Sequence, residues 1–307
     1  MRIGVVGIGG VGGYYGGKLA RHFPAGSEHD ILFLCRGAHM ETIRRNGLRV
    51  ISREDEFVSC PLLATDSPAE MGSLDVVLFC VKGYDLASTA ALLMPAVRED
   101  TVLIPLGNGV NNDEVVSQAL GKGDCLNGCV YISTHIEGPG VIEQTGGNCK
   151  LLFGSIDGVM EPYRPLEKVF RQAGIDAALS PAIAKDVWMK FAFIDPVSGV
   201  TSLHGCTVGE ALAASRWRSE LENMMAEVAA LAEAKGAGLP EDVVSQSLNK
   251  VGAFPPDTKS SMQLDVEAGR KTELDTMLGY VVREGSRLGV DTPVHNSVYE
   301  SLRNRVP

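Results

Sequence analysis

The sequence predicts a two-domain protein in which an α/β domain, residues 1–180, precedes an all-helical domain, residues 181–307. In the first part, short β-rich runs alternate with amphipathic helical runs, as in a doubly wound parallel sheet. After Pro181 the chain changes to long segments rich in Ala, Leu, Glu and Met, with helical periodicity and Gly stops. A chain of 307 residues is long enough to bury two cores.

The strands of the first domain are predicted from four apolar runs. They are "RIGVVG" at 2–7, "DILFLC" at 30–35, "DVVLFCVK" at 75–82 and "TVLIPLGN" at 101–108. Each run ends at a Gly, Cys-Arg, Lys or Asn turn, as buried parallel strands do. The pieces between them, such as 11–23 and 85–97, are amphipathic and predict helices. The Gly-rich stretch 129–154 predicts further, partly antiparallel strands.

Composition and charge exclude several classes of protein. The hydrophobic content of 45% and charged content of 21% are ordinary for a globular chain. No apolar run approaches the roughly 20 residues of a membrane span, and the N-terminus lacks a signal-peptide pattern, so we expect a cytoplasmic protein without a membrane partner. The net charge of −10 disfavours nucleic acid as a partner. The seven cysteines lack zinc-type spacing, so free thiols and no metal site are expected.

The N-terminal glycines carry the first functional prediction. Gly7-x-Gly9-x-x-Gly12 follows a strand and opens a helix. In that context Gly7 makes a tight turn, Gly9 lets the backbone approach a pyrophosphate, and Gly12 lets the helix pack on the strand. The helix N-terminus adds free N–H groups and a positive dipole end. We therefore predict a Rossmann-type dinucleotide site, although a purely structural glycine turn is the alternative.

The end of the second predicted strand indicates which dinucleotide binds. Arg36 stands there, where sites that prefer NAD place Asp or Glu to hold the ribose 2′-hydroxyl. An Arg at this position suits a 2′-phosphate instead. The sequence predicts NADP(H) as cofactor, with a solvated surface arginine as the other possibility.

Three further polar residues are candidates for the same site. Lys82 and Asn108 follow consecutive strands, at the sheet edge where α/β proteins bind ligands. Either could be only a turn residue. Lys190 lies in "DVWMKFAFIDPVSG", and apolar neighbours should lower the pKa of a buried lysine. A lysine that extends its ammonium to water is the simpler reading.

The chain resembles the 2-dehydropantoate 2-reductase (ketopantoate reductase) family over nearly its whole length. The similarity lies in "GIGGVGGYYGGKLA", "CVKGYD", "LGNGV", "GPGVIEQTGG" and, most specifically, "SSMQLDVEAGRKTELD". It implies a Rossmann-type domain, a helical C-terminal domain and an active site in the cleft between them. It also implies NADPH-dependent reduction of 2-dehydropantoate to pantoate, on the route to pantothenate and coenzyme A.

The resemblance also assigns roles to individual residues. Lys190 corresponds to the catalytic lysine that protonates the nascent alkoxide, and Glu273 to the glutamate that holds the substrate hydroxyl. Ser261 corresponds to a contact of the substrate carboxylate, and Asn108 to a residue at the junction of cofactor and substrate. Lys82 and Arg36 correspond to cofactor contacts.

The chain departs from the family pattern at two positions. The family usually has Asn four and eight residues after the lysine, where this chain has Ile194 and Ser198. Isoleucine cannot hydrogen-bond through its side chain, whereas Ser198 keeps a hydroxyl with shorter reach. Pro196 removes a helical hydrogen bond and should kink the helix. Ser198 remains a candidate substrate contact, but the identity of the 2-oxo acid is left open.

Three alternatives follow from this departure. The chain could reduce another branched 2-oxo acid, it could act on an opine- or imine-type substrate, or it could be a non-catalytic NADP(H)-binding sensor. The apolar faces of the C-terminal helices, for example "MMAEVAALAEA", could pack in the core or against a second subunit, so a homodimer is possible.

Overall fold

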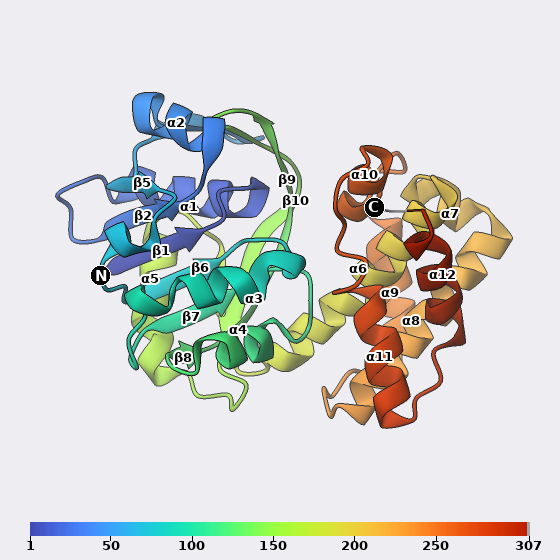
Figure 1. Ribbon diagram of the computed structural model, residues 1–307. Coiled ribbons are helices and arrows are strands. Elements are labelled where there is room, and N and C mark those ends of the chain that lie inside the picture. Colours follow the sequence, from blue (N-terminus) through green and yellow to red (C-terminus); the bar gives the residue numbers. More distant parts are fainter. Residues whose placement is uncertain (306–307) are drawn as a thin grey trace. The chain divides into compact units, whose positions relative to one another are not determined.

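The computed structural model describes residues 1–305 and divides into two units (Figure 1). Unit 1 comprises Met1–Gly107 and Asn111–Ile183, and unit 2 comprises Asn108–Val110 and Ala184–Pro307. The short segment Asn108–Val110 therefore groups with the helical unit, although it follows directly from unit 1 in the chain.

Unit 1 is built on a six-stranded parallel sheet that confirms all four predicted strands. The order is β5 (Leu63–Thr65), β2 (Asp30–Leu34), β1 (Arg2–Val6), β6 (Val76–Phe79), β7 (Val102–Pro105) and β8 (Asp124–Cys125). From β1 the chain moves outward to β2 and β5, then returns to β6 on the other side of β1. Ligands in such sheets bind at this switch, beyond the carboxyl ends of β1 and β6.

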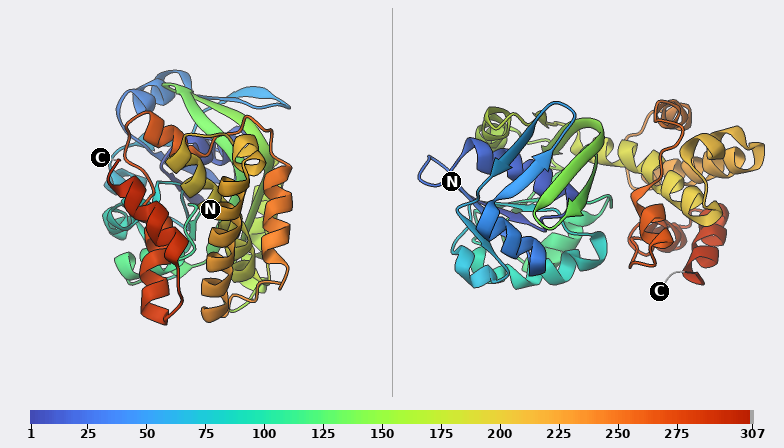
Figure 2. Two further views of the ribbon diagram at one scale, coloured as in Figure 1. Left: turned by 90° about the vertical axis from the view of Figure 1, so that its right-hand side faces the viewer. Right: turned by 90° about the horizontal axis from the view of Figure 1, so that it is seen from above.

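A second sheet lies on the other side of helix α1 (Gly10–His22). Its order is β11 (Ala177–Leu179), β10 (Val141–Gly154), β3 (Leu48–Ile51) and β4 (Glu56–Ser59), and β9 (Asn127–Gly138) pairs antiparallel with β10. The antiparallel strands predicted for 129–154 are confirmed, whereas β3, β4 and β11 were not predicted. The right-hand view of Figure 2 shows this second layer.

The close approach of α1 to the second sheet explains its many glycines. A Cβ on Gly10 would lie 2.5 Å from the carbonyl oxygen of Thr134, and one on Gly13 would lie 2.4 Å from Ile142. These positions admit only hydrogen, so the helix backbone packs directly on β9 and β10. The remaining helices of unit 1 are α2 (Gly37–Asn46), α3 (Gly83–Leu92), α4 (Asn112–Leu120) and α5 (Arg164–Gln172).

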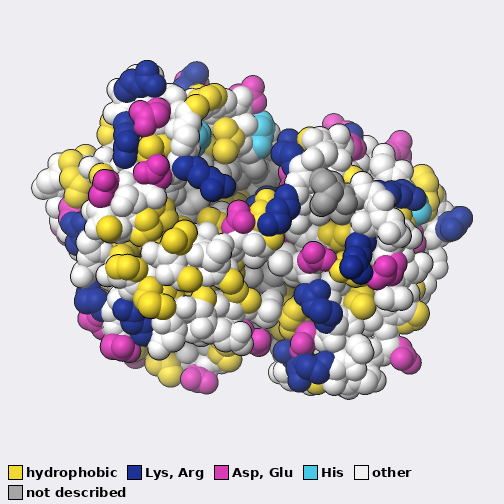
Figure 3. All heavy atoms as spheres, viewed as in Figure 1, with side chains coloured by type: hydrophobic (Ala, Val, Ile, Leu, Met, Phe, Trp, Pro, Cys, Tyr) yellow, Lys and Arg dark blue, Asp and Glu magenta, His cyan; other side chains and the backbone are white. Residues whose placement is uncertain are grey.

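Unit 2 is helical, as predicted. It contains most of α6 (Ile183–His204), together with α7 (Val208–Ala213), α8 (Ser215–Ala234), α9 (Val243–Gly252), α10 (Ser261–Glu267), α11 (Leu278–Leu288) and α12 (Pro293–Arg303). Helix α8 contacts α7, α9, α11 and α12. Of the helices within residues 1–305, none combines the length and hydrophobicity that a membrane span requires. On the face drawn in Figure 3, acidic and basic side chains are interspersed rather than separated by sign.

A buried network of charged groups joins three helices of unit 2. The imidazole of His295 on α12 lies between two carboxylates: Nδ1 is 2.6 Å from Oε2 of Glu227 on α8, and Nε2 is 2.8 Å from Oδ2 of Asp195 on α6. Glu227 also accepts the N–H groups of Val294 and His295 in the first turn of α12. Burial alone would lower the pKa of His295, but the hydrogen bonds and charges of both carboxylates raise it to about 9.

This pKa predicts how stability depends on pH. An unfolded histidine titrates near 6.5, so the stabilisation from the raised pKa of His295 is fully present below pH 6.5 and is lost as pH rises through about 9. We expect the free energy of unfolding to fall by about 3 kcal/mol across this interval. Urea unfolding at a series of pH values measures it. A His295→Gln variant with the same slope as the wild-type protein would contradict the assignment.

Candidate functional site

The glycine turn after β1 has the conformation that a dinucleotide site requires. Gly7 has a φ of +87°, and its N–H donates to Leu34 O at 3.0 Å, which ties the turn to the end of β2. A Cβ on Gly12 would lie 2.1 Å from Gly7 O, so only glycine allows the helix to start this close to the strand. A Cβ on Gly9, by contrast, would meet nothing within 4 Å. The space in front of Gly9 fits a bound pyrophosphate.

The contrast between Gly9 and Gly12 gives a matched pair of substitutions. Gly9→Ala is expected to leave the thermal midpoint nearly unchanged and to weaken dinucleotide binding at least tenfold, because the methyl group enters the open space. Gly12→Ala is expected to lower stability by about 1–3 kcal/mol through overpacking. Thermal unfolding and fluorescence titration with NADPH separate the two effects. Unchanged NADPH affinity in Gly9→Ala would contradict a pyrophosphate at this position.

The other two predicted cofactor residues start helices at the same edge of the sheet. Arg36 is the N-cap residue of α2, two residues after β2, and is exposed. Lys82 is the N-cap residue of α3 and is partly buried. One carboxylate was overlooked in the sequence: Asp66, just after β5, is close enough to Cys35 to affect its pKa, which burial raises to about 11. A positive side chain, Arg36, and a negative one, Asp66, therefore both lie near the end of β2.

Thr134 on β9 is a further polar group at the glycine turn. A Cβ on Gly10 would lie 2.6 Å from its Oγ1, and within residues 1–305 this buried oxygen has no hydrogen-bond partner. A hydroxyl that can donate beside the first turn of α1 suits an anionic ligand. No sequence pattern indicates it, because Thr134 lies far along the chain in a stretch that predicts only a strand.

In unit 2, Lys190 of α6 is buried and hydrogen-bonded rather than extended to water. Only 7% of the residue is exposed, and its Nζ donates to Asn108 Oδ1 at 2.8 Å. The aromatic rings of Trp188 and Phe191 pack against each other and against Tyr280 of α11, which fixes this part of the helix. The simple reading of a lysine with a solvated ammonium is therefore wrong.

The two positions that depart from the family pattern differ in exposure. Ile194, one turn after Lys190, is partly exposed, whereas Ser198, two turns after it, is only 2% exposed. Ile194 is thus the accessible apolar group next to the amine on this face of α6. Helix α6 runs without interruption from Ile183 to His204 and includes Pro196.

The remaining predicted substrate residues lie around α10. Ser261 is the first residue of that helix and is exposed, while the N-cap Ser260 is held 2.9 Å from Thr201 Oγ1 of α6. The same helix that carries Lys190 therefore also fixes the start of α10. Glu273 lies between α10 and α11 and is 5% exposed. Buried carboxylates are uncommon unless they have a structural or chemical role.

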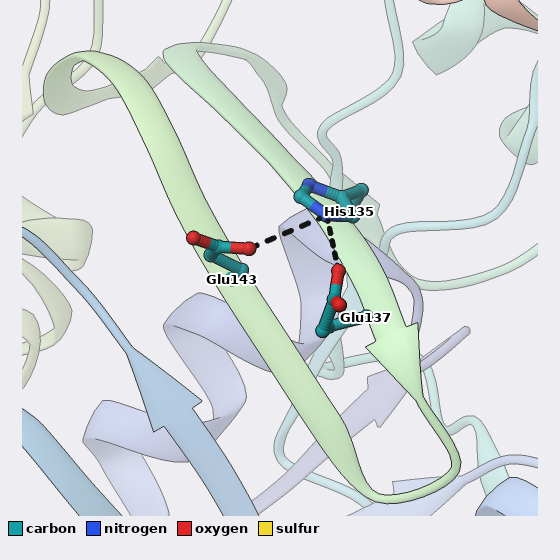
Figure 4. A group of neighbouring side chains, drawn as sticks. All are labelled: His135, Glu137 and Glu143. Atoms are coloured by element: carbon teal, nitrogen blue, oxygen red, sulfur yellow. Dashed lines mark hydrogen bonds and ion pairs between the residues drawn. The ribbon is translucent and has the colours of Figure 1, made fainter.

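One group of side chains on the β9–β10 hairpin has the donor types of a metal site. The Nε2 of His135 lies 3.0 Å from Glu137 Oε2 and 3.5 Å from Glu143 Oε2, as Figure 4 shows. Glu143 is the cross-strand partner of His135, and Glu137 lies two residues further along β9. Both His135 and Glu137 are exposed. These are ordinary surface contacts between an imidazole and two carboxylates, and nothing else on the hairpin indicates a metal.

Comparison with known proteins identifies the family of both units. The family model described as ketopantoate reductase PanE/ApbA matches residues 3–158, and the model for the C-terminal part of ketopantoate reductase PanE/ApbA matches residues 182–306. A Bacillus subtilis protein named uncharacterized oxidoreductase YkpB is 30% identical, over 99% of this chain and 98% of its own. A 2-dehydropantoate 2-reductase from a Nostoc species is 26% identical, over 97% of this chain and 93% of its own.

Solved structures agree with these matches. The 2-dehydropantoate 2-reductase of Porphyromonas gingivalis is 33% identical, with a TM-score of 0.84 over 98% of this chain and 99% of that one. A D-mandelate dehydrogenase determined with NADH and anilino(oxo)acetate shares the fold at 20% identity. Its TM-score is 0.88 over 99% of this chain and 98% of that one. The chain belongs to the ketopantoate reductase family, whose members are NAD(P)-dependent oxidoreductases, and it is an oxidoreductase that acts on CH–OH groups.

Proposed function

We propose that the protein reduces a 2-oxo acid with NADPH, and that 2-dehydropantoate, which would give pantoate, is the first substrate to test. The observation that carries this proposal is Lys190, a residue that is only 7% exposed and whose Nζ is hydrogen-bonded to Asn108. A buried amine with a fixed direction can donate a hydrogen bond to a carbonyl oxygen and stabilise the negative charge that this oxygen gains during reaction. The named activity of relatives such as the Porphyromonas gingivalis enzyme supports the same substrate class.

The proposed roles of the residues follow from the chemistry of carbonyl reduction. The bound dinucleotide supplies the hydride that reaches the carbonyl carbon. Lys190 donates an N–H hydrogen bond to the carbonyl oxygen and transfers that proton as the alkoxide forms, leaving a neutral amine. Asn108 Oδ1 holds the ammonium in place through its 2.8 Å hydrogen bond. The resemblance to the family, rather than this chemistry, gives Ser261 the role of donor to the substrate carboxylate and Glu273 the role of acceptor from a substrate hydroxyl.

The cofactor assignment rests on the residues around the glycine turn. The open space at Gly9 accommodates a pyrophosphate beside the N-terminus of α1, where Thr134 adds a hydroxyl. Arg36 supplies the positive charge for a 2′-phosphate. The fold does not choose between the two dinucleotides, since a D-mandelate dehydrogenase of the same fold was solved with NADH. The choice of NADPH therefore depends on Arg36.

A substrate panel tests the proposal. Oxidation of NADPH is followed at 340 nm with 2-dehydropantoate, with branched 2-oxo acids that lack its hydroxyl, and with 2-oxo acids plus amines. Reduction of at least one 2-oxo acid without an amine supports the proposal. Turnover only with an amine present would identify an opine- or imine-type enzyme instead. NADPH binding without turnover of any compound would favour the sensor alternative.

Ile194 gives a prediction about specificity within the panel. A partly exposed isoleucine beside the amine offers no hydrogen bond to a substrate hydroxyl, so Ile194→Asn should favour hydroxylated substrates. We expect kcat/KM for 2-dehydropantoate, relative to its analogue without the hydroxyl, to rise about tenfold. Ser198→Asn, at a position that is only 2% exposed, serves as the comparison. An unchanged ratio in Ile194→Asn would show that this side chain does not contact the substrate.

A further inference from the structure

The turn of α6 that follows Lys190 is intrinsically weak. Pro196 has no N–H, so the carbonyl of Ala192, two residues after Lys190, loses its helical hydrogen bond. A helix without this bond can bend at that point. Any bend between 192 and 196 would change the direction of Lys190 relative to the rest of unit 2. The helix is nevertheless continuous from Ile183 to His204.

The buried network attaches at this weak turn. Asp195 directly precedes Pro196 and is fully buried, and its Oδ2 is 2.8 Å from His295 Nε2. Asp195 follows Lys190 by five residues, which corresponds to a rotation of about 140° around the helix and about 7.5 Å along it. The network therefore holds a different side of the helix from the one that carries the amine.

The network is directional and well anchored. Both ring nitrogens of His295 face carboxyl oxygens, at 2.6 and 2.8 Å, and with Asp195 and Glu227 ionised each nitrogen donates one hydrogen bond. Glu227 is fixed in turn by two backbone N–H groups of α12. The attachment of Asp195 thus extends through His295 to two other helices, α12 and α8.

We propose that Asp195, through His295 and Glu227, is a positioning residue for Lys190, and that it holds the proline-weakened turn of α6 so that the amine keeps its direction. This inference rests on the proposed function only for the effect on turnover. It does not depend on which 2-oxo acid is the substrate. A purely stabilising role is a poor explanation, because an apolar side chain of similar volume often stabilises a core as well as a buried ion pair does.

Two substitutions and one matched control test the proposal. Asp195→Asn keeps the shape and one hydrogen bond to His295, whereas Asp195→Leu fills a similar volume without a hydrogen bond. Glu220→Gln is the control. Glu220 Oε2 of α8 makes a 2.6 Å contact with His204 Nε2 of α6, so this pair also joins α6 to α8. His204 lies eight residues after Pro196, away from the weak turn. Circular dichroism and thermal unfolding establish that each variant is folded at the assay temperature.

Two measurements are made on each variant. The first is kcat together with KM for NADPH. The second is the acylation of Lys190 by trace acetic anhydride, relative to the exposed Lys185, read by peptide mass spectrometry without any turnover. We expect Asp195→Leu to lower kcat about 10- to 100-fold with KM for NADPH within about twofold. Its relative acylation of Lys190 should change, while Asp195→Asn and Glu220→Gln stay close to wild type in both measurements.

Three outcomes would overturn the proposal. Asp195→Leu could keep the wild-type kcat and the wild-type acylation of Lys190. Glu220→Gln could lower kcat as much as Asp195→Leu, which would indicate general destabilisation. Asp195→Asn could be as impaired as Asp195→Leu although it keeps the hydrogen bond. If the wild-type protein reduces no 2-oxo acid, the proposed function fails, and the acylation measurement alone decides the positioning role.

Discussion

Lys190→Met is expected to lower kcat for 2-oxo acid reduction by about a thousandfold while NADPH affinity stays within about twofold. Methionine has a similar length and no charge, so it preserves packing against the apolar neighbours of α6. It removes both the hydrogen bond to the developing alkoxide and the proton that completes the reduction. Because the same N–H supplies both, the two effects overlap, and their joint loss falls within the range of about 10²–10⁴-fold known for such groups. Stopped-flow measurement of NADPH oxidation at saturating substrate gives the rate of the reductive step.

The control for this prediction lies on the same helix. Lys185 is exposed, so Lys185→Met removes one positive charge from α6 without touching the buried amine, and wild-type kcat is expected. Asn108→Ala should be intermediate, because it leaves the ammonium in place but removes the acceptor that directs it. Retention of more than a tenth of wild-type kcat by Lys190→Met would mean that another group protonates the alkoxide.

The sheet of unit 1 could be predicted because its signals are local. Each of the four predicted strands lies within one apolar run, and the Gly, Arg, Lys or Asn of the following turn comes directly after it in the sequence. The glycine turn was predictable for the same reason, since Gly7, Gly9 and Gly12 act within six residues of each other. The short strands β3, β4, β5, β8 and β11 were missed, because two to four residues carry too little periodicity to distinguish a strand from a loop.

The candidate site could be predicted only in part, because its contacts join distant positions. The hydrogen bond between Lys190 and Asn108 spans 82 residues, and the contact between Asp195 and His295 spans 100. The apolar neighbours of Asp195 suit a buried side chain, but nothing in the sequence identifies His295 as its partner. The sequence indicated a kink at Pro196, and the described helix continues through it, with the network attached at the adjacent residue.

Arg36→Ala is expected to raise KM for NADPH about 10- to 100-fold and to leave KM for NADH within about threefold. The N–H of Gly7 donates to Leu34 O, so Arg36, two residues further on, stands beside the turn that would hold the pyrophosphate. The two dinucleotides differ only in the 2′-phosphate, and a charge-assisted hydrogen bond to it is worth about 1.5–3 kcal/mol. Because Arg36 is exposed, the wild-type preference should weaken as ionic strength rises.

The control for Arg36 separates a specific contact from a general electrostatic effect. Arg45 is also exposed and lies on α2, the helix that Arg36 caps, so Arg45→Ala removes the same charge at a different position. It should change KM for NADPH by less than about threefold at physiological ionic strength, where separated surface charges are largely screened. Equal effects of the two substitutions would mean that the net charge of α2, rather than a bond from Arg36, attracts the phosphate. Equal use of NADH and NADPH by the wild-type protein would point to Asp66 as the residue that offsets Arg36 at the end of β2.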